Sequence, residues 1–312
     1  MSKIQQFVSV VAYVHNNTDQ IEKFVTTVMN QCEKFITCEI IFVDDFSTDN
    51  STNNIRQYYT THKVDYIVTI IRLGKYHGLE IAMNAGRDMA IGDYVFEFDD
   101  LYVDYDGNTI MDAYEKCLEG NDIVTVSTDV PIKLTSKYFY RVFNKAIDSN
   151  SQIGQESFRL LSRRGINRIS SMGIDIPYRK VIYMNSGLST GEVKYQSTTG
   201  DRPARISEKT ERIDLAIDSF IYFTKVIQRL SLIVALIFGL ISLGTIIYTL
   251  VSRGMGYHVG MGWVSTMLFL SIGFSGLFGF LAIIIRYLSL IVNLVFKRQK
   301  YLISDIEKIA SK

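Results

Sequence analysis

The sequence has few cysteines, and none of them are spaced as in a metal site. The three cysteines are Cys32, Cys38 and Cys117, and no CxxC motif occurs. An odd number of cysteines without ligand spacing argues against a disulfide framework and against a zinc site. We therefore expect buried or partly buried thiols in a reducing compartment.

The chain also lacks a strong net charge and a leader segment. Its formal net charge is +1, so no global field would attract nucleic acid and we expect no such partner. The opening residues MSKIQQFVSVVAYVHNN hold one lysine and a short apolar run. They lack the long apolar region and small-residue cleavage site of a signal peptide, so we expect none.

Charged residues are absent from two long runs in the last third of the chain. Residues 230–251 (LSLIVALIFGLISLGTIIYTLV) and 261–285 (MGWVSTMLFLSIGFSGLFGFLAIII) contain no charged side chain. Each is long enough to cross the roughly 30 Å hydrocarbon layer as a helix. A chain of 312 residues is also too long for one ordinary core. The sequence predicts a two-helix transmembrane hairpin at residues 230–296.

Positive charges flank the two uncharged runs, whereas the loop between them carries only Arg253. The flanking basic residues are Lys225, Arg229, Arg286, Lys297, Arg298 and Lys300. The positive-inside rule then predicts a multi-pass protein of the cell membrane, with both termini cytoplasmic and membrane lipids as partners. Glycines in the spans offer close-packing positions for a homo-oligomer. The final segment ISDIEKIASK is expected to form a short amphipathic or frayed helix.

The first part of the chain alternates between apolar runs and amphipathic segments. Short apolar runs predict strands at residues 7–14, 39–43, 66–72, 93–98 and 122–127. Helical spacing of apolar residues lies between them, at residues 19–32, 51–61, 78–91 and 110–118. Strands separated by helices of this length imply an α/β fold with a mostly parallel sheet and right-handed crossovers.

Two acidic pairs follow two of the predicted strands. Asp44 and Asp45 come directly after the second strand, and Asp99 and Asp100 after the fourth. Ligands of such sheets bind at the carboxyl ends of the strands. Clustered carboxylates repel one another unless a cation joins them, and Mg²⁺ or Mn²⁺ takes oxygen ligands. Each aspartate taken alone would be read as a turn or helix cap.

Five segments, in order along the chain, resemble a known family. They are VSVVAYVHNN, EIIFVDDFSTDNS, GLEIAMNAGRDMAIGDYVFEFDDL, SKYFYRVFNKAI and GQESFRLLSRR. The chain resembles family-2 glycosyltransferases with the GT-A (Rossmann-like) fold, in particular the polyprenyl-phosphate group of dolichol-phosphate mannose synthases and bactoprenol glucosyltransferases. The resemblance implies an inverting enzyme that moves a sugar from UDP-sugar or GDP-sugar to polyprenyl phosphate, with Mg²⁺ or Mn²⁺ as cofactor.

The resemblance also implies site residues. The nucleotide-sugar-binding set is Tyr13, His15, Asn17, Asp44, Asp45 and Asn84. Asn and Asp side chains suit this role because they can accept N–H donors of a base edge. Arg202, Arg205 and Lys209 are the residues expected to bind the lipid phosphate.

The metal site of the family, D-x-D, is shifted in this sequence. Aligning the segment on its following leucine puts Phe98 where the first aspartate belongs, and Asp100 keeps the second position. Neighbouring residues of a strand point to opposite faces, so Asp99 need not aim where Phe98 does. The predicted metal ligands are Asp100 and Asp99, with Asp104 or Asp106 as further candidates.

Ser157 stands where the related D-F-R-L motif carries a candidate general base. Serine cannot act as a base near neutral pH, but a phosphate acceptor is already ionised, so positioning and charge matter more. Glu156 either replaces the base, if the loop turns it inward, or is solvated. Arg159 matches the arginine of the motif and is expected to contact phosphate, because a guanidinium fork fits phosphate oxygens. Glu156, Ser157 and Arg159 form the predicted catalytic set.

These features divide the chain into four predicted parts. They are a cytoplasmic GT-A nucleotide-sugar domain at residues 1–177, amphipathic interface helices at 178–229, the hairpin at 230–296 and a cytoplasmic tail at 297–312. Two other functions stay open. One is a transferase acting on another lipid or a glycan, although the Q-x-x-R-W motif of processive synthases is absent. The other is a catalytically degenerate relative that binds a nucleotide sugar without turnover.

Overall fold

The computed structural model describes residues 3–130, 156–172, 179–198, 262–295 and 301–310, with isolated positions between 233 and 255. The chain forms two compact units. One comprises Met1–Ser219 together with Gln299–Lys312, and the other is Phe220–Arg298.

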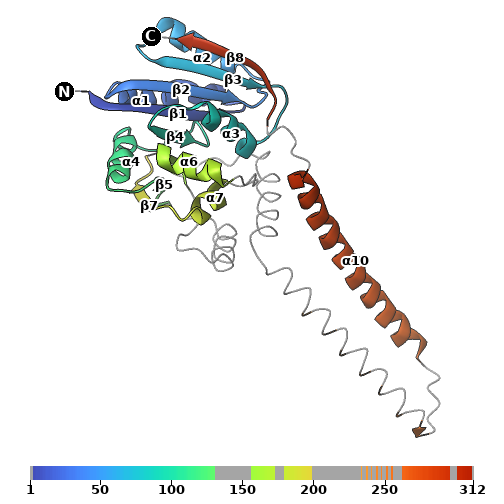
Figure 1. The fold of residues 1–312 in the computed structure, drawn as a ribbon. Helices are drawn as coiled ribbons and strands as arrows, with labels where there is room; N and C mark the ends of the chain where they lie inside the picture. Colours follow the sequence, from blue (N-terminus) through green and yellow to red (C-terminus); the bar gives the residue numbers. More distant parts are fainter. Residues whose placement is uncertain are drawn as a thin grey trace. The chain divides into compact units, whose positions relative to one another are not determined.

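The first unit is built on an eight-stranded sheet in the order β7-β5-β6-β4-β1-β2-β3-β8 (Figure 1). The strands are β1 (Ile4–Val14), β2 (Phe35–Asp44), β3 (Ile67–Leu73), β4 (Tyr94–Phe98), β5 (Ile123–Thr128), β6 (Phe158–Ser162), β7 (Thr190–Tyr195) and β8 (Ile303–Ala310). Strands β4, β1, β2 and β3 run parallel, β6 is antiparallel to β4 and β5, and β8 is antiparallel to β3. The predicted α/β fold with a mostly parallel sheet is confirmed.

Helices lie at the four segments that the periodicity predicts. The helices are η1 (Thr18–Gln20), α1 (Ile21–Cys32), α2 (Ser51–Thr61), α3 (Leu79–Met89), α4 (Asn108–Leu118), α6 (Arg163–Ser171) and α7 (Arg179–Asn185), of which α6 and α7 are additional to those four segments. One face of β1 contributes Val8 and Val10 to a core that includes Phe24 of α1. On α3, a Cβ added to Gly86 would overlap the side chains of Val11 and Val43. Glycine therefore lets α3 lie close against the sheet and fixes the position of the loop that precedes it.

Two predicted helical segments are strands instead. The tail expected to be a helix forms β8, which pairs with β3. Residues 190–195, expected within the interface helices at 178–229, form β7 and pair with β5. In both cases pairing with a distant strand overrides the local pattern, because an edge strand gains its hydrogen bonds from its partner. Residue 178 and residues 199–229 lie outside the described residues.

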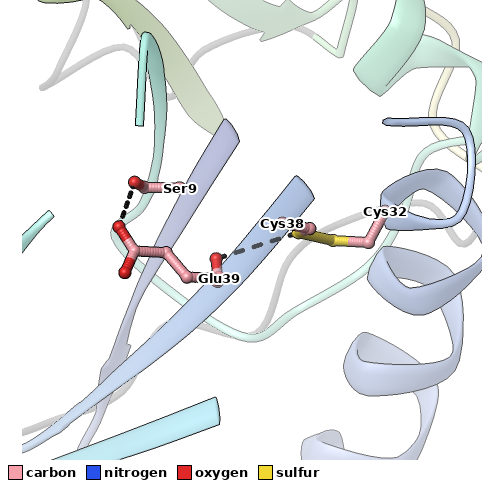
Figure 2. The surroundings of a disulfide bond; sticks show 4 residues. All are labelled: Ser9, Cys32, Cys38 and Glu39. Atoms are coloured by element: carbon pink, nitrogen blue, oxygen red, sulfur yellow. Dashed lines mark hydrogen bonds between the residues drawn. A yellow bond between two sulfur atoms is a disulfide. The ribbon is translucent and has the colours of Figure 1, made fainter. Parts of the chain in front are cut away.

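The expectation of free thiols is wrong for two of the three cysteines. Cys32 and Cys38 form a disulfide with a Cα–Cα distance of 5.7 Å (Figure 2). Helix α1 ends at Cys32 and β2 begins at Phe35, so a tight reversal of the chain brings the two sulfurs together. Cys117 is free and buried, and burial raises the pKa of its thiol to about 11. An odd cysteine count did not exclude a pair.

The second unit contains α10 (Trp263–Val295), a helix of 33 residues. Several large apolar side chains of α10 are exposed, among them Phe269, Leu277 and Leu288. In the part of the chain that the structure describes, no helix meets the length and hydropathy needed to cross a membrane. The transmembrane hairpin at 230–296 stays a prediction.

Candidate functional site

Three loops meet at the carboxyl edge of the parallel strands. They follow β1 (residues 15–17), β2 (45–50) and β3 (74–78). Their meeting is dictated by topology, because β1, β2 and β3 are parallel neighbours and therefore end at the same edge. This is the edge at which ligands of open α/β sheets bind.

Asp45 links the three loops. Its carboxylate is fully buried and accepts hydrogen bonds from the backbone N–H groups of His77 and Gly78, both at 2.8 Å, and from the Tyr13 hydroxyl at 3.1 Å. The backbone carbonyl of Asp45 lies 2.8 Å from Nδ1 of His15. Asp45 therefore sets the shape of the edge, and its side chain is already occupied by protein donors.

Gly78 makes the approach of the third loop possible. Its φ of +86° and ψ of 160° lie in a region that only glycine adopts without strain. The turn directs its N–H at Asp45 and starts α3 in the next residue.

The loop after β1 is held by asparagine side chains. Asn17 is buried, and its Oδ1 accepts the His15 N–H at 2.7 Å. Asn16 adopts a left-handed φ of 55° and accepts the Thr48 N–H at 2.9 Å. The structure thus brings Tyr13, His15 and Asn17 together with Asp45, as predicted for a shared site, although their ligand role stays a prediction.

Aromatic rings cover the exposed side of this edge. The ring of Tyr76 lies 4.7 Å from that of His15, and Tyr76 is 44% exposed. Phe46, with a left-handed φ of 58°, is 51% exposed. Exposed aromatic rings beside polar groups suit the flat face of a nucleobase.

The carboxylates of Asp44 and Asp45 are buried, and burial makes their ionised forms unfavourable. Burial raises the pKa of both, even though the bonds from Ser47 to Asp44 and from His77 and Gly78 to Asp45 act in the other direction. Asp44 is 6% exposed and accepts the Ser47 N–H at 3.0 Å. A ligand that brings a donor or a cation to this edge would stabilise the ionised forms.

A buried ionic network lies farther along the edge, under the end of β4. Its acids are Glu80, Glu97, Asp99 and Glu156, and its bases are Arg87, Arg159, Arg179 and Lys180. Arg87 joins through the Tyr183 hydroxyl, which donates to Glu97 at 2.9 Å. Among the residues that the structure describes, the four formal negative charges of this network equal its four positive ones, so protein cations compensate the buried carboxylates.

Strand pairing explains how Arg159 enters this network. Glu97 and Arg159 are directly paired residues of β4 and β6. Arg159, 1% exposed, donates to Glu97 at 3.2 Å, to Asp99 at 2.7 Å and to Glu156 at 3.0 Å. The predicted phosphate contact of Arg159 stays untested, and in this structure its guanidinium binds protein carboxylates. Glu156 is turned inward rather than solvated.

The predicted metal ligands have different surroundings. Asp99 is held by Arg159 and Arg179, each at 2.7 Å. Burial alone would raise the pKa of Asp99, but the two guanidinium groups outweigh it and hold the pKa well below its usual range. Such a carboxylate does not fit a metal ligand, whereas Asp100, which is half-buried and accepts the Tyr102 N–H at 3.0 Å, is compatible with one. Within the described ranges, no group of three or more His, Cys, Asp or Glu side chains converges as a metal site.

Ser157 is part of a buried hydrogen-bonded chain. Its Oγ lies 2.5 Å from the Tyr195 hydroxyl, which donates to Asp104 at 2.7 Å. Asp104, one of the further metal candidates, also accepts from Ser197 at 3.2 Å. Asp104 therefore holds β7 through Tyr195.

Of the other predicted site residues, one is described and three are not. Asn84 lies on α3, and its Oδ1 accepts from Arg87 at 2.7 Å. It therefore touches the ionic network rather than Asp45. Arg202, Arg205 and Lys209 lie outside the described residues.

Sequence reasoning missed Arg179. Its guanidinium is fully buried and donates to Glu80, Glu97 and Asp99. The available signal was indirect: Glu97 stands inside an apolar strand, and a buried carboxylate requires a cation. The partner itself is more than 80 residues away along the chain.

Comparisons with known proteins show to which family the chain belongs. The family described as "Glycosyl transferase family 2" matches residues 9–172. An uncharacterized glycosyltransferase of Synechocystis is 28% identical over 53% of this chain and 52% of its own length. The bactoprenol glucosyl transferase of Shigella phage SfV is 30% identical over 64% of this chain and 66% of its own length.

A prophage bactoprenol glucosyl transferase homolog of Escherichia coli is also 30% identical, over 60% of this chain and 62% of its own length. The chain thus spans between about half and two thirds of the length of these curated relatives.

Among solved structures, the mannosyltransferase of Pyrobaculum calidifontis in complex with GDP-Man and Mn²⁺ is similar with a TM-score of 0.51. Its identity is 17%, and the match covers 70% of this chain and 64% of the other. At that identity the likeness supports the fold alone. Because the family match covers more than half of the chain, from the first strand through α6, this protein belongs to glycosyl transferase family 2.

Proposed function

We propose that this protein is a membrane-bound inverting glycosyltransferase. It moves a sugar from a UDP-sugar or GDP-sugar to polyprenyl phosphate, and the product serves cell-surface glycan modification. The observation that carries the proposal is the set of polar and aromatic loops joined by Asp45 at the carboxyl edge of a family 2 domain. The names of the relatives from Shigella phage and Escherichia coli support the acceptor.

The reaction is a single displacement. An oxygen of the acceptor phosphate attacks the anomeric carbon, the bond from that carbon to the nucleoside diphosphate breaks, and the configuration inverts. The acceptor oxygen is already ionised, so the reaction needs no general base, in keeping with serine at position 157. The loops after β1, β2 and β3 would bind the nucleotide, while the compensated network keeps the sugar side of the edge rigid.

A divalent ion, Mg²⁺ or Mn²⁺, would offset the charge of the departing diphosphate. Asp100 is the residue that would hold it, together with oxygens of the donor, since Asp99 is engaged by two arginines. The mannosyltransferase of Pyrobaculum calidifontis was solved with Mn²⁺, which supports this cofactor class.

Membrane attachment is part of the proposal. The uncharged runs at residues 230–251 and 261–285 support it, as do the exposed apolar side chains of α10, because a large apolar surface is costly in water. The flanking basic residues favour cytoplasmic termini. Arg202, Arg205 and Lys209 would bind the lipid phosphate at the membrane surface, and the spans could associate into a homo-oligomer.

A transfer assay tests this function. Membranes that contain the full chain are incubated with radiolabelled UDP-sugars or GDP-sugars and a short polyprenyl phosphate. Label that enters the lipid phase only when polyprenyl phosphate is present supports the proposal. Label in another acceptor supports a different transferase, and nucleotide binding without any transfer identifies a degenerate relative.

The Asp100→Ala variant tests the metal assignment. We expect transfer to fall on the order of 100-fold, because a group that positions charge next to the leaving diphosphate is lost. Asp112→Ala, an exposed aspartate of α4, is the matched control and should retain wild-type transfer. Unchanged transfer by Asp100→Ala, or wild-type transfer that persists in a chelator, would refute this role of Asp100.

A further inference from the structure

The C-terminal strand reaches the loop that shapes the candidate nucleotide site. β8 pairs with β3 along its whole length, and its residue Glu307 forms ion pairs with α2 and β3. The Glu307 carboxylate accepts from Arg56 at 2.8 Å and from Arg72 at 3.2 Å. In Figure 1, β8 is the red strand beside β3, and α2 lies next to it.

Leu302, the residue just before β8, forms hydrogen bonds with the loop at residues 74–78. The Gly74 N–H donates to the Leu302 carbonyl at 2.8 Å, and the Leu302 N–H donates to Nε2 of His77 at 3.2 Å. A Cβ on Gly74 would lie 2.9 Å from the Leu302 side chain, so the approach is close. Tyr301 adds a bond to Asp88 at 3.0 Å.

The hydrogen bonds of His77 define its role. Nδ1 lies 2.6 Å from the Lys75 carbonyl, which can only accept, so Nδ1 carries the proton. Nε2 is then the acceptor for the Leu302 N–H. The side chain of His77 is 7% exposed, and its ring connects the C-terminal segment to the 74–78 loop.

The same loop supplies two donors to Asp45. The N–H groups of His77 and Gly78 bind its carboxylate, and Tyr76, one residue earlier, lies beside His15. A displacement of His77 would therefore move both the groups that orient Asp45 and the exposed ring of Tyr76.

We propose that the C-terminal segment at residues 301–310 helps to form the nucleotide site. The hydrogen bond from Leu302 to His77 holds the 74–78 loop in place, so His77 is a positioning residue for donor binding. The inference rests on the proposed function only in taking the donor nucleotide as the ligand of this edge. It gives the segment that follows α10 in the chain a role in donor affinity.

Two substitutions of His77 distinguish the roles of its two ring nitrogens. His77→Gln places an amide near the Nε2 position and keeps an acceptor for Leu302. His77→Asn places its amide near the Nδ1 position and loses the tail contact. We expect His77→Asn to weaken UDP or GDP binding about three- to tenfold, the effect of one lost hydrogen bond, and to raise the donor KM by the same factor with little change in kcat. The nucleotide affinity and donor KM of His77→Gln should be close to those of the wild type.

Hydrogen exchange of the 74–78 amides in the full-length protein provides a readout that needs no ligand. The exchange of the Gly78 amide should be faster in His77→Asn than in the wild type and in His77→Gln, with equal melting temperatures. Equal exchange in all three proteins, or equal damage by both substitutions, would overturn the proposal. A lack of transfer to polyprenyl phosphate with the exchange difference intact would reject the proposed function and leave the positioning role standing.

Discussion

Replacing Arg179 by methionine is expected to lower the free energy of unfolding of the first unit by about 3–5 kcal/mol. The guanidinium is fully buried and donates to Glu80 at 2.8 Å, to Glu97 at 2.9 Å and to Asp99 at 2.7 Å. Methionine fills a similar volume but leaves these carboxylates without a shared cation. Denaturant unfolding of the full-length protein, followed by circular dichroism, measures the loss.

Arg168→Met is the matched control, because Arg168 is an exposed residue of α6. Its effect should stay within about 0.5 kcal/mol. The free energy of unfolding of Arg179→Lys should lie between those of Arg179→Met and Arg168→Met. An ammonium group keeps the charge but cannot bind three carboxylates as a planar guanidinium does. Equal stability of Arg179→Met and Arg168→Met would contradict the role of the network.

The pH dependence of stability should change in the same variant. Burial would raise the pKa of Asp99, but Arg159 and Arg179 outweigh it and lower the pKa below its ordinary value. A carboxylate with a lowered folded-state pKa contributes stability above its unfolded pKa and loses it as pH falls through the folded value. The contribution of Asp99 should therefore persist below about pH 4 in the wild type and should disappear at a higher pH in Arg179→Met.

The parts of the fold that could be predicted are those with a local signal. The strands at residues 7–14 and 39–43 are mostly apolar, and the acidic pairs follow strands whose parallel arrangement fixes a common edge. The meeting of Tyr13, His15 and Asn17 with Asp45 follows from that topology. These features can be predicted without knowing which residues far away in the sequence contact them.

The parts that could not be predicted depend on partners far along the chain. The segment ISDIEKIA is a strand because it pairs with β3, at least 230 residues away in the sequence, whereas its isoleucines alone suggest a helix. Asp99 was expected to hold a metal, since nothing near it in the sequence identifies Arg179 as its counterion. A local pattern shows that a buried charge needs a partner but not which residue supplies it.

The Asp45→Asn variant should lower nucleotide affinity at least about 30-fold, the equivalent of about 2 kcal/mol. The substitution keeps the size of the side chain but replaces one acceptor oxygen by an NH₂ group. In one orientation the NH₂ faces the His77 N–H, and in the other it faces the Gly78 N–H and the Tyr13 hydroxyl. Either way a buried donor meets a donor, and the loops that it joins must separate. Titration calorimetry with UDP and GDP measures the loss directly, without the transfer reaction.

Asp122→Asn separates loss of the site from general loss of stability. Asp122 is also buried and accepts from Ser162 at 2.7 Å and from Arg164 at 2.7 and 2.8 Å. It precedes β5, which runs parallel to β4 because β6 is antiparallel to both, so it lies at the opposite edge of the sheet. Both variants should lose some stability, but only Asp45→Asn should lose nucleotide affinity. If the two variants bound nucleotide equally well, the edge joined by Asp45 would not be the donor site, and the ligand of this domain would have to be sought elsewhere.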